Sequence, residues 1–331
     1  KRRASLTVGE IEIRAVLTEM TGIPASGLTE SIRYENIKSV LSEEIIGQER
    51  AVTCVCDAIL RHFSGITDPK RPIGVFLFLG ESGVGKTALA TALAKALFPS
   101  EDSLSRYDMS EFSERHSVSK LIGSPPGYVG YDEGGSLTEK IRRHPFSVVL
   151  FDEIEKAHPE VTNLLLQITD VGSLTDSTGR RVSFRNACII MTSNVGTDGY
   201  RNVSVSGFSG DNEASHATDA LLKGYFRPEL INRIDEIVRF SPLDESALAA
   251  IAKKQLEELV TRLSAIGLSA TFSPEVCSFL AKKSKKSGQG ARPLARLIID
   301  GIENPISEKL ATHSIEKNAS LHIFVENDVL R

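Results

Sequence analysis

Residues 74–94 read GVFLFLGESGVGKTALATALA and place a strand, a glycine-rich turn and a helix in direct succession. Residues 75–79 are apolar without alternation, which indicates a strand covered on both faces. Gly80, Gly83 and Gly85 permit a tight turn, whose N–H groups surround phosphate together with the positive end of the following helix. The order of the three elements predicts a polyphosphate site and disfavours a chance glycine-rich surface turn.

Two side chains at the end of this turn complete the motif G-x-x-x-x-G-K-[ST]. Lys86 adds positive charge toward the outer phosphates, and Thr87 offers a hydroxyl group to Mg²⁺. The expected ligands are therefore a polyphosphate and Mg²⁺. The loop residues expected to bind them are Gly80, Glu81, Ser82, Gly83, Val84, Gly85, Lys86 and Thr87.

The composition is that of an ordinary globular protein with room for two domains. The chain has 331 residues, of which 41% are hydrophobic, and no apolar run approaches the roughly 18 residues of a membrane span. The basic start at residues 1–3 is not followed by the apolar region of a signal peptide, and the missing initiator Met suggests a fragment. The net charge of −4 disfavours nucleic acid as a partner.

Four cysteines, Cys54, Cys56, Cys188 and Cys277, show neither C-x-x-C spacing nor histidine pairs at the spacing of metal ligands. We interpret them as small buried thiols in a reducing compartment, and expect a cytoplasmic protein.

A second buried strand is expected over residues 147–151 (SVVLF), and it ends in the acidic pair Asp152 and Glu153. Open parallel sheets bind ligands at the carboxyl ends of their strands. At that edge Asp152 is suited to holding Mg²⁺, directly or through its water shell, and Glu153 to polarising the water that attacks a γ-phosphate. The pair also fits a cap for the following helix, but the upstream phosphate loop favours the catalytic interpretation.

Another buried strand is expected over residues 187–192, and a shorter one over residues 105–108. Asn194 follows the former strand at the same ligand edge. It is suited to orienting the attacking water, although Asn is also an ordinary turn residue after a strand.

The remaining chain consists of predicted helices and loops. Glycine-rich loops are expected over residues 123–135 and 196–214. Helices are expected over residues 5–21, after residue 48 toward Arg61, within residues 226–235, and from residue 244 onward. The last of these begins a smaller domain of helices and a terminal strand over residues 321–325.

A series of short motifs is distributed along nearly the whole chain. They are TGIP (21–24), IGQ (46–48), DPKRPIG (68–74), the phosphate loop, DMSE (108–111), HSVS (116–119), GYVG (127–130), LFDEIEKAH (150–158) and FRPE (226–229). In this order the motifs resemble the AAA+ ATPase module of the Clp family of protein unfoldases, specifically the C-terminal module of ClpC- and ClpB-like proteins.

The resemblance implies an α/β fold, with a P-loop ATPase domain around a central parallel sheet followed by a smaller, mainly helical α+β lid. The domain boundaries it implies are a lead-in over residues 1–40, the ATPase domain over 41–240 and the lid over 241–331. It also implies a homo-oligomeric ring, a hexamer, that threads protein substrates through its pore.

The resemblance further implies roles for single residues. Ile45 and Ile46 flank adenine, Asn194 senses nucleotide from its strand, and Arg292 does so from the lid. Arg233 is the arginine finger that reaches a neighbour's ATP, although from spacing alone Arg227 and Arg233 are surface ion-pair residues. Tyr128 and Val129 lie on the axial pore loop, and residues 172–180 form a second pore loop.

Three functional interpretations follow. The first is the ATPase subunit of a ClpC-like protease that docks on ClpP through Gly207 and Phe208, where Ser206 replaces the aliphatic residue of the family's docking tripeptide. The alternative is a protease-independent, ClpB-like disaggregase. A nucleic-acid switch or loader is disfavoured by the lack of a basic excess.

Two further features depart from the family pattern. Glu44 stands where a basic residue is common in the family. Only one phosphate loop is present, so an upstream ATPase module either lies outside this sequence or does not exist in this protein.

Overall fold

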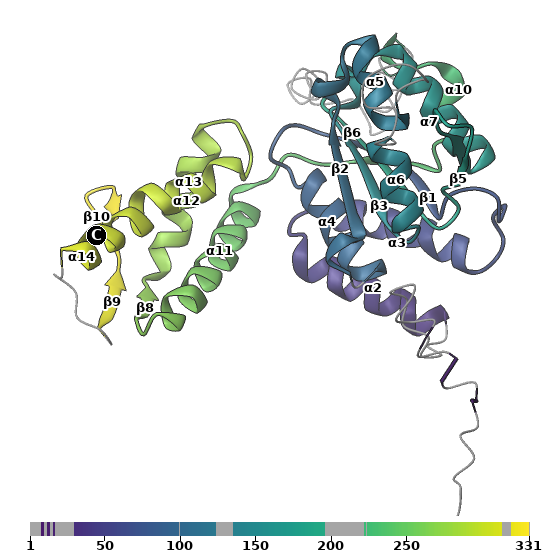
Figure 1. Cartoon of the computed structure of the whole chain (residues 1–331). Helices are drawn as coiled ribbons and strands as arrows, with labels where there is room; N and C mark the ends of the chain where they lie inside the picture. Colours follow the sequence, from purple (N-terminus) through teal and green to yellow (C-terminus); the bar gives the residue numbers. More distant parts are fainter. Residues whose placement is uncertain are drawn as a thin grey trace, which may run out of the picture. The chain divides into compact units, whose positions relative to one another are not determined.

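The computed structural model describes residues 8, 9, 12, 13, 16, 30–98, 100–123, 135–195, 222, 224–312 and 319–330. The chain divides into two compact units (Figure 1). The first comprises Lys1–Ile45, Glu49–Leu79 and Lys86–Arg239, and the second Ile46–Gln48, Gly80–Gly85 and Phe240–Arg331.

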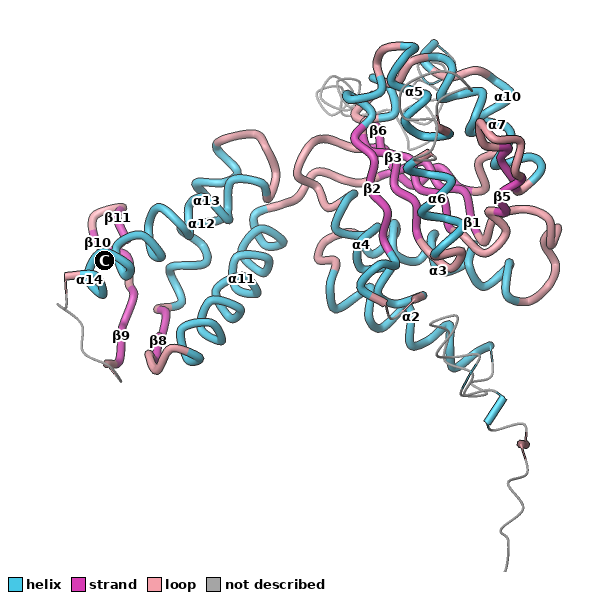
Figure 2. Tube along the Cα trace, in the orientation of Figure 1, coloured by secondary structure: helices cyan, strands magenta, loops and turns pink. Residues whose placement is uncertain are grey.

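The first unit is built on a parallel sheet of five strands, which runs through its centre (Figure 2). The strands are β1 (Gly74–Leu79), β2 (Leu104–Asp108), β3 (Val148–Asp152), β6 (Cys188–Ser193) and β7 (Glu236–Arg239), in the order β2-β3-β6-β1-β7. Every residue of β1, β3 and β6 is buried, as their unbroken apolar runs predict.

Helices cover both faces of this sheet. Alternate β1 residues, such as Val75 and Leu77, pack into one core with Leu165 and Ile168 of α7. Helices α3 and α4 form the other layer, since α3 contacts β1 and β7 while α4 contacts β3 and β6. The helices of this unit are α2 (Glu30–Glu44), α3 (Glu49–Phe63), α4 (Lys86–Leu97), α5 (Arg115–Ile122), α6 (Ser136–Arg143), α7 (Pro159–Val171) and α10 (Pro228–Ile231).

Short elements complete the first unit. Three 3₁₀ turns are η1 (Glu101–Ser103), η2 (Met109–Phe112) and η4 (Ile154–Lys156). The antiparallel hairpin of β4 (Ser173–Thr175) and β5 (Arg181–Ser183) brackets residues 176–180, within the segment expected to be the second pore loop.

The sequence predicted no helix over α2. This helix packs against α3 and α4 and buries Ile37 and Leu41, one turn apart. Of the helix predicted over residues 5–21, only residues 8, 9, 12, 13 and 16 are described.

The second unit is mainly helical, as predicted. Its helices are α11 (Glu245–Ala265), α12 (Pro274–Lys286), α13 (Arg292–Ile298), the π-helix η5 (Ile299–Glu303) and α14 (Asn304–Ala311). Asp244 caps α11 by accepting a hydrogen bond from the backbone of Ala247, and Gly267, at φ 83°, follows the end of the helix.

The strands of the second unit are shorter than predicted. The expected strand over residues 321–325 is split into β9 (Ser320–Ile323), which pairs in parallel with β8 (Ser269–Phe272), and β10 (Val325–Glu326), which pairs with β11 (Val329–Leu330). Asn327 and Asp328, both at positive φ, form the two-residue turn of the β10–β11 hairpin. The parallel sheet and the helical second unit confirm the predicted fold class.

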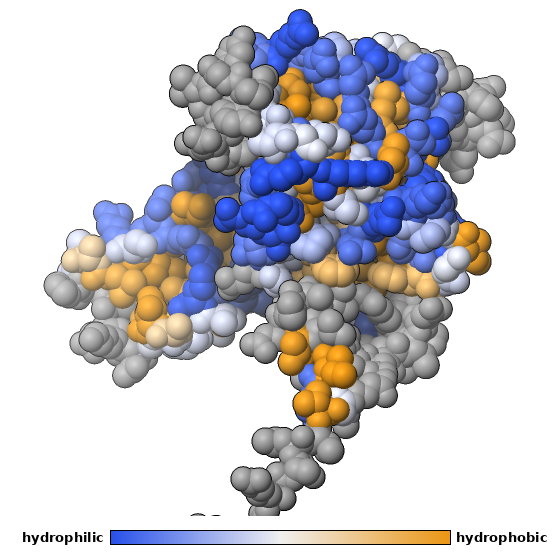
Figure 3. Space-filling model, turned by 45° about the vertical axis from the view of Figure 1, so that its right-hand side comes forward, coloured by the Kyte–Doolittle hydropathy of each residue, from blue (hydrophilic) through white to orange (hydrophobic). Residues whose placement is uncertain are grey.

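Hydrophilic residues cover most of the described surface that the first unit presents in Figure 3. In the described part of the chain, no helix is long and apolar enough to cross a membrane.

The four cysteines form no disulfide bonds. Cys56 and Cys188 are buried, while Cys54 and Cys277 are half-buried. Burial raises the pKa of Cys56 to about 11.

Candidate functional site

The carboxyl ends of β1, β3 and β6 meet at one edge of the sheet. Leu79 of β1 pairs with Ser193 of β6, and Phe151 of β3 pairs with Met191 of β6. The phosphate loop begins at this edge, directly after β1. Asp152 is the last residue of β3, and Asn194 directly follows β6. The parallel register therefore gathers the polar residues that the sequence placed after separate strands.

The lysine of the phosphate loop contacts the asparagine that follows β6. The Lys86 ammonium group donates a hydrogen bond of 2.7 Å to Oδ1 of Asn194. Lys86 is the first residue of α4 and is only 8% exposed. A nearly buried cation held at this edge by a neutral amide is suited to contacting a phosphate oxygen.

Asp152 is held by two neighbours in the sheet. Its Oδ1 accepts a short hydrogen bond from the Thr192 hydroxyl group, and its Oδ2 forms an ion pair of 2.6 Å with Arg106 on β2. A carboxylate and the hydroxyl group of Thr87 are hard oxygen ligands of the kind that Mg²⁺ prefers. The donor chemistry therefore fits the predicted metal, with Arg106 as a second cation that already neutralises part of the Asp152 charge.

Glu153 adopts a backbone conformation that is uncommon for a residue with a side chain. Its φ and ψ of 57° and 53° lie in the left-handed region, and its N–H donates to Thr192 Oγ1 at 3.0 Å. Such strain is concentrated at functional sites. The carboxylate bonds Lys156 at 2.5 Å, and this hydrogen bond and negative charge raise the pKa of Lys156.

Glu155 fixes the backbone on the other side of the site. Its Oε1 accepts a hydrogen bond of 3.2 Å from the backbone N–H of Asn194. Its Oε2 is buried without a hydrogen-bond partner among the described residues. Through Glu155, the turn after β3 positions the residue that contacts Lys86.

Within the second unit, the phosphate loop contacts the start of α13. The backbone N–H of Ala291 donates to the carbonyl oxygen of Gly83 at 2.9 Å. Gly83, at φ 78°, must be glycine because a Cβ atom would lie 2.2 Å from the carbonyl oxygen of Gln289. Arg292, the predicted lid sensor, is exposed at the first position of α13, directly after this contact.

The two isoleucines expected to flank adenine differ in their surroundings. Ile45 is buried and lines a cavity of about 310 Å³ in the first unit. The other residues that line this cavity are Glu44, Thr87, Ala88, Thr91, Ala92 and Lys95. Ile46 is half-buried and packs against the core of the second unit. An adenine-binding role for both stays a prediction.

Arg233 lies at the amino ends of the strands, whereas Lys86 lies at their carboxyl ends. It precedes β7, and the neighbouring Asp235 bonds Val75 at the start of β1: its backbone N–H donates to the Val75 carbonyl oxygen, and its Oδ2 accepts from the Val75 N–H. At about 3.3 Å per residue, the two ends of β1 are roughly 16 Å apart. Arg233 is 46% exposed in its side chain and pairs with Asp170 of α7 at 2.8 Å, so the surface ion pair suggested by spacing is present.

Several predicted residues lie outside the described part of the chain. These are Tyr128 and Val129 of the pore loop, and Ser206, Gly207 and Phe208 of the docking segment. Arg227, the alternative surface residue, donates to Asn163 Oδ1 at 2.8 Å.

Sequence reasoning missed the residues that orient the site. Thr192 closed the predicted strand at residues 187–192, but it bonds both Asp152 and the backbone of Glu153. The signal available in the sequence was a polar residue that ends an apolar run; the structure shows that this residue is fully buried. Arg106 and Glu155 gave no such signal, because their contacts depend on which strands are neighbours.

Replacing Thr192 by the isosteric valine is expected to lower the rate constant of ATP hydrolysis about tenfold while ATP affinity is retained. The change removes a hydrogen bond to a buried carboxylate, which is worth about 1.5–3 kcal/mol. Steady-state kinetics and nucleotide titration measure the two effects. Thr271→Val, an exposed strand threonine bonded to Leu321, is the control and should leave both unchanged. Normal turnover in Thr192→Val would remove this residue from the site.

Two family models match the chain. Residues 71–237 match the AAA domain (Cdc48 subfamily), and residues 243–323 match the C-terminal, D2-small domain of ClpB protein. The first segment covers β1, β2, β3, β6 and part of β7 with helices α4, α5, α6, α7 and α10, whereas α2 and α3 precede it. The second covers the helices of the second unit with β8 and β9.

Similar proteins are named as ClpB chaperones. The chain is 47% identical over 325 residues to chaperone protein ClpB 1 of Synechococcus elongatus, a match that covers 98% of this chain and 37% of the relative. It is 48% identical over 324 residues to chaperone protein ClpB of Oceanobacillus iheyensis, with coverages of 96% and 40%. The chain thus spans about two fifths of the length of these relatives.

Proposed function

The chain belongs to the Clp family of AAA ATPases, and we propose that it is the ATP-hydrolysing module of a ClpB-type chaperone that threads polypeptides through a ring. The hydrogen bond between Lys86 and Asn194, beside the Thr192–Asp152–Arg106 chain, is the observation that carries the ATP-hydrolysing part of this proposal, and the ClpB-type part is supported by the similar proteins. It unites a phosphate-binding cation, a metal-binding carboxylate and a water-orienting amide at one edge of the sheet.

The chemistry proposed for this edge is attack of water on the γ-phosphate of ATP. Glu153 accepts a proton from the water while Asn194 orients it. The bond between the γ-phosphorus and the bridging oxygen breaks, and Lys86 stabilises the charge that develops on the phosphates. Thr87 and Asp152 would hold Mg²⁺, which would neutralise charge on the β- and γ-phosphates.

Arg233 is proposed to complete the site of a neighbouring subunit. Because it lies at the start of β7 and not at the Lys86 edge, it is poorly placed for its own ATP. An arginine supplied by a neighbour requires an oligomer, and a hexameric ring is the proposed assembly.

The relatives correct the order of the functional interpretations. The sequence placed a ClpC-like protease subunit first, but the similar proteins are named ClpB chaperones, which favours the protease-independent alternative. They give no support to ClpP as a partner or to a role in proteolysis.

A direct experiment compares unfolding with and without the protease. The full-length protein is given a tagged fluorescent protein and ATP, and loss of fluorescence is followed with and without ClpP. We expect unfolding that does not depend on ClpP, and no degradation when ClpP is added. Degradation of the substrate in the presence of ClpP would restore the protease interpretation.

Tyr128, which lies outside the described residues, is proposed to grip the threaded polypeptide. Tyr128→Ala should abolish unfolding of the fluorescent substrate while basal ATP hydrolysis stays within about twofold, because the residue does no phosphate chemistry. Tyr128→Phe retains the aromatic ring and should retain unfolding. Tyr225→Ala, at a tyrosine that is 63% exposed, controls for loss of a surface ring. Equal loss of hydrolysis and unfolding in Tyr128→Ala would indicate a structural tyrosine instead.

A further inference from the structure

Arg71, in the segment before β1, joins three parts of the first unit through one guanidinium group. Its Nη2 donates to the carbonyl oxygen of Arg233 at 2.6 Å, and its Nε donates to the carbonyl oxygen of Thr169 at 3.3 Å. Its Nη1 forms an ion pair of 2.9 Å with Asp235. All three nitrogens therefore have partners. Thr169 lies on α7, and Arg233 and Asp235 are the two ends of the short segment before β7.

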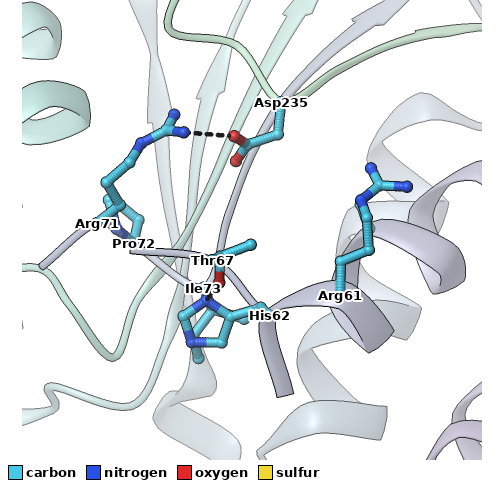
Figure 4. A pocket seen from close by; sticks show the side chains of 8 residues that line it. Arg61, His62, Thr67, Arg71, Pro72, Ile73 and Asp235 are labelled. Atoms are coloured by element: carbon cyan, nitrogen blue, oxygen red, sulfur yellow. Dashed lines mark hydrogen bonds and ion pairs between the residues drawn. The ribbon is translucent and has the colours of Figure 1, made fainter. Parts of the chain in front are cut away.

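Asp235 extends this connection to the strand that carries the phosphate loop. Its Oδ2 accepts a hydrogen bond from the backbone N–H of Val75, and its own N–H donates to the carbonyl oxygen of Val75, each at 2.8 Å. Figure 4 shows the Arg71 and Asp235 side chains pointing toward one another. The backbone on either side of Ile234 is thus fixed to β1 and α7 at once.

The side chain of Arg233 is held less firmly than its backbone. Its guanidinium group contacts Asp170 in a pair whose side chains are 46% and 49% exposed. Pairs this exposed are weak and easily exchanged for another partner. The side chain is therefore free to leave Asp170 for a phosphate group, whereas its point of attachment is fixed by Arg71.

We propose that Arg71 is a positioning residue that holds the backbone of Arg233 so that its guanidinium group reaches the ATP of a neighbouring subunit. This proposal rests on the function proposed above for Arg233. Lysine is a poor substitute because a single ammonium group lacks the planar arrangement of donors that spans three separated acceptors.

The cavity beside Arg71 makes substitution there informative. It has a volume of about 170 Å³ and is lined by Ala58, Arg61, His62, Thr67, Arg71, Pro72, Ile73 and Asp235. A methionine or lysine side chain at position 71 has room in it, so overpacking is not expected. Arg61 lines the same cavity but pairs with Glu236, and Arg61→Met is therefore the matched control.

The test uses the assembled protein and measures steady-state ATP hydrolysis. Arg71→Met should lower the rate constant roughly 10²-fold, the scale of a misplacement of about 1 Å in a reacting group, while the Kd for a fluorescent ATP analogue stays within about twofold. Arg71→Lys should lie between Arg71→Met and the parent protein. Arg61→Met should retain parental hydrolysis.

Mixing subunits separates positioning from a general structural role. Arg71→Met subunits keep an intact ATP site, so mixtures with Glu153→Gln subunits, whose Arg233 is normally held, should regain hydrolysis. The double variant Arg71→Met/Arg233→Ala should be no slower than Arg233→Ala alone, because both changes remove the same contribution.

Three results would overturn the proposal. Parental hydrolysis in Arg71→Met is the first, and additive losses in the double variant are the second. The third is failure of Arg71 mixtures to regain hydrolysis while mixtures of Arg233→Ala with Glu153→Gln succeed. If the Arg233→Ala mixtures fail as well, the role of Arg233 itself is wrong and the positioning role falls with it. If Arg71→Met does not fold, Arg71→Lys is carried through the same mixtures and judged by the same three results.

Discussion

Arg233→Ala is expected to reduce ATP hydrolysis by roughly 10³- to 10⁵-fold, the range typical of an arginine finger. In the proposed role, the guanidinium group would stabilise charge that develops on the transferred phosphoryl group, a contribution that alanine cannot make. Nucleotide affinity should change little, because an arginine finger interacts mainly with charge that develops in the transition state and not with bound ATP in the ground state. Hydrolysis of radiolabelled ATP covers the required range of rates, and a fluorescent analogue reports binding.

The matched control for this variant is Arg142→Ala. Both arginines are half exposed in their side chains, at 53% for Arg142 and 46% for Arg233, and each pairs with a carboxylate at 2.8 Å. They differ in position, since Arg142 is on α6 and Arg233 precedes β7. Equal hydrolysis in the two variants would show that Arg233 is only a surface ion-pair residue.

Glu153→Gln should bind ATP normally but hydrolyse it at least roughly 10²-fold more slowly, the scale of a positioned general base. Glutamine preserves the shape of the side chain and removes its ability to accept a proton from water. The strained backbone of Glu153 and its hydrogen bond to Thr192 keep the side chain at the strand end.

Glu257→Gln is the control for the charge change. Glu257 is an exposed residue of α11 that pairs with Lys253, and its substitution should leave hydrolysis unchanged. Full turnover in Glu153→Gln would transfer the base role to another group.

The central strands, and the functional residues at their carboxyl ends, were predictable because the sequence patterns that indicate them are local. The apolar runs at residues 75–79 and 148–151 are too continuous for a half-exposed strand, and the phosphate loop and Asp152 follow them at once. Parallel pairing then brings Asp152 and Asn194 to the edge where the phosphate loop begins. The prediction needed only that the strands be parallel, not their order.

Contacts between segments far apart in the sequence were not predictable in the same way. The ion pair between Arg106 and Asp152 exists because β2 and β3 are neighbours, and the hydrogen bonds of Arg71 exist because β7 lies beside β1. Neither arginine differs in local sequence from a solvent-exposed cation.

Helix α2 was missed for a different reason. It turns Ile37 and Leu41 into the core, while Val40 between them is 41% exposed. Its apolar residues are few and charged residues surround them, so the helical period is weak. Packing against α3 and α4 stabilises a helix whose local sequence signal is poor.

The central claim is that Arg233 of one subunit completes an ATP site built from Lys86, Asp152 and Glu153 of another. Steady-state ATP hydrolysis, measured while Arg233→Ala and Glu153→Gln subunits are mixed at varied ratios and constant total concentration, tests it most directly. Each parent should be nearly inactive, and the rate should pass through a maximum at intermediate ratios, where an intact site meets an intact arginine. A rate that never exceeds that of either parent, in mixtures shown to contain both subunits in one assembly, would contradict the claim.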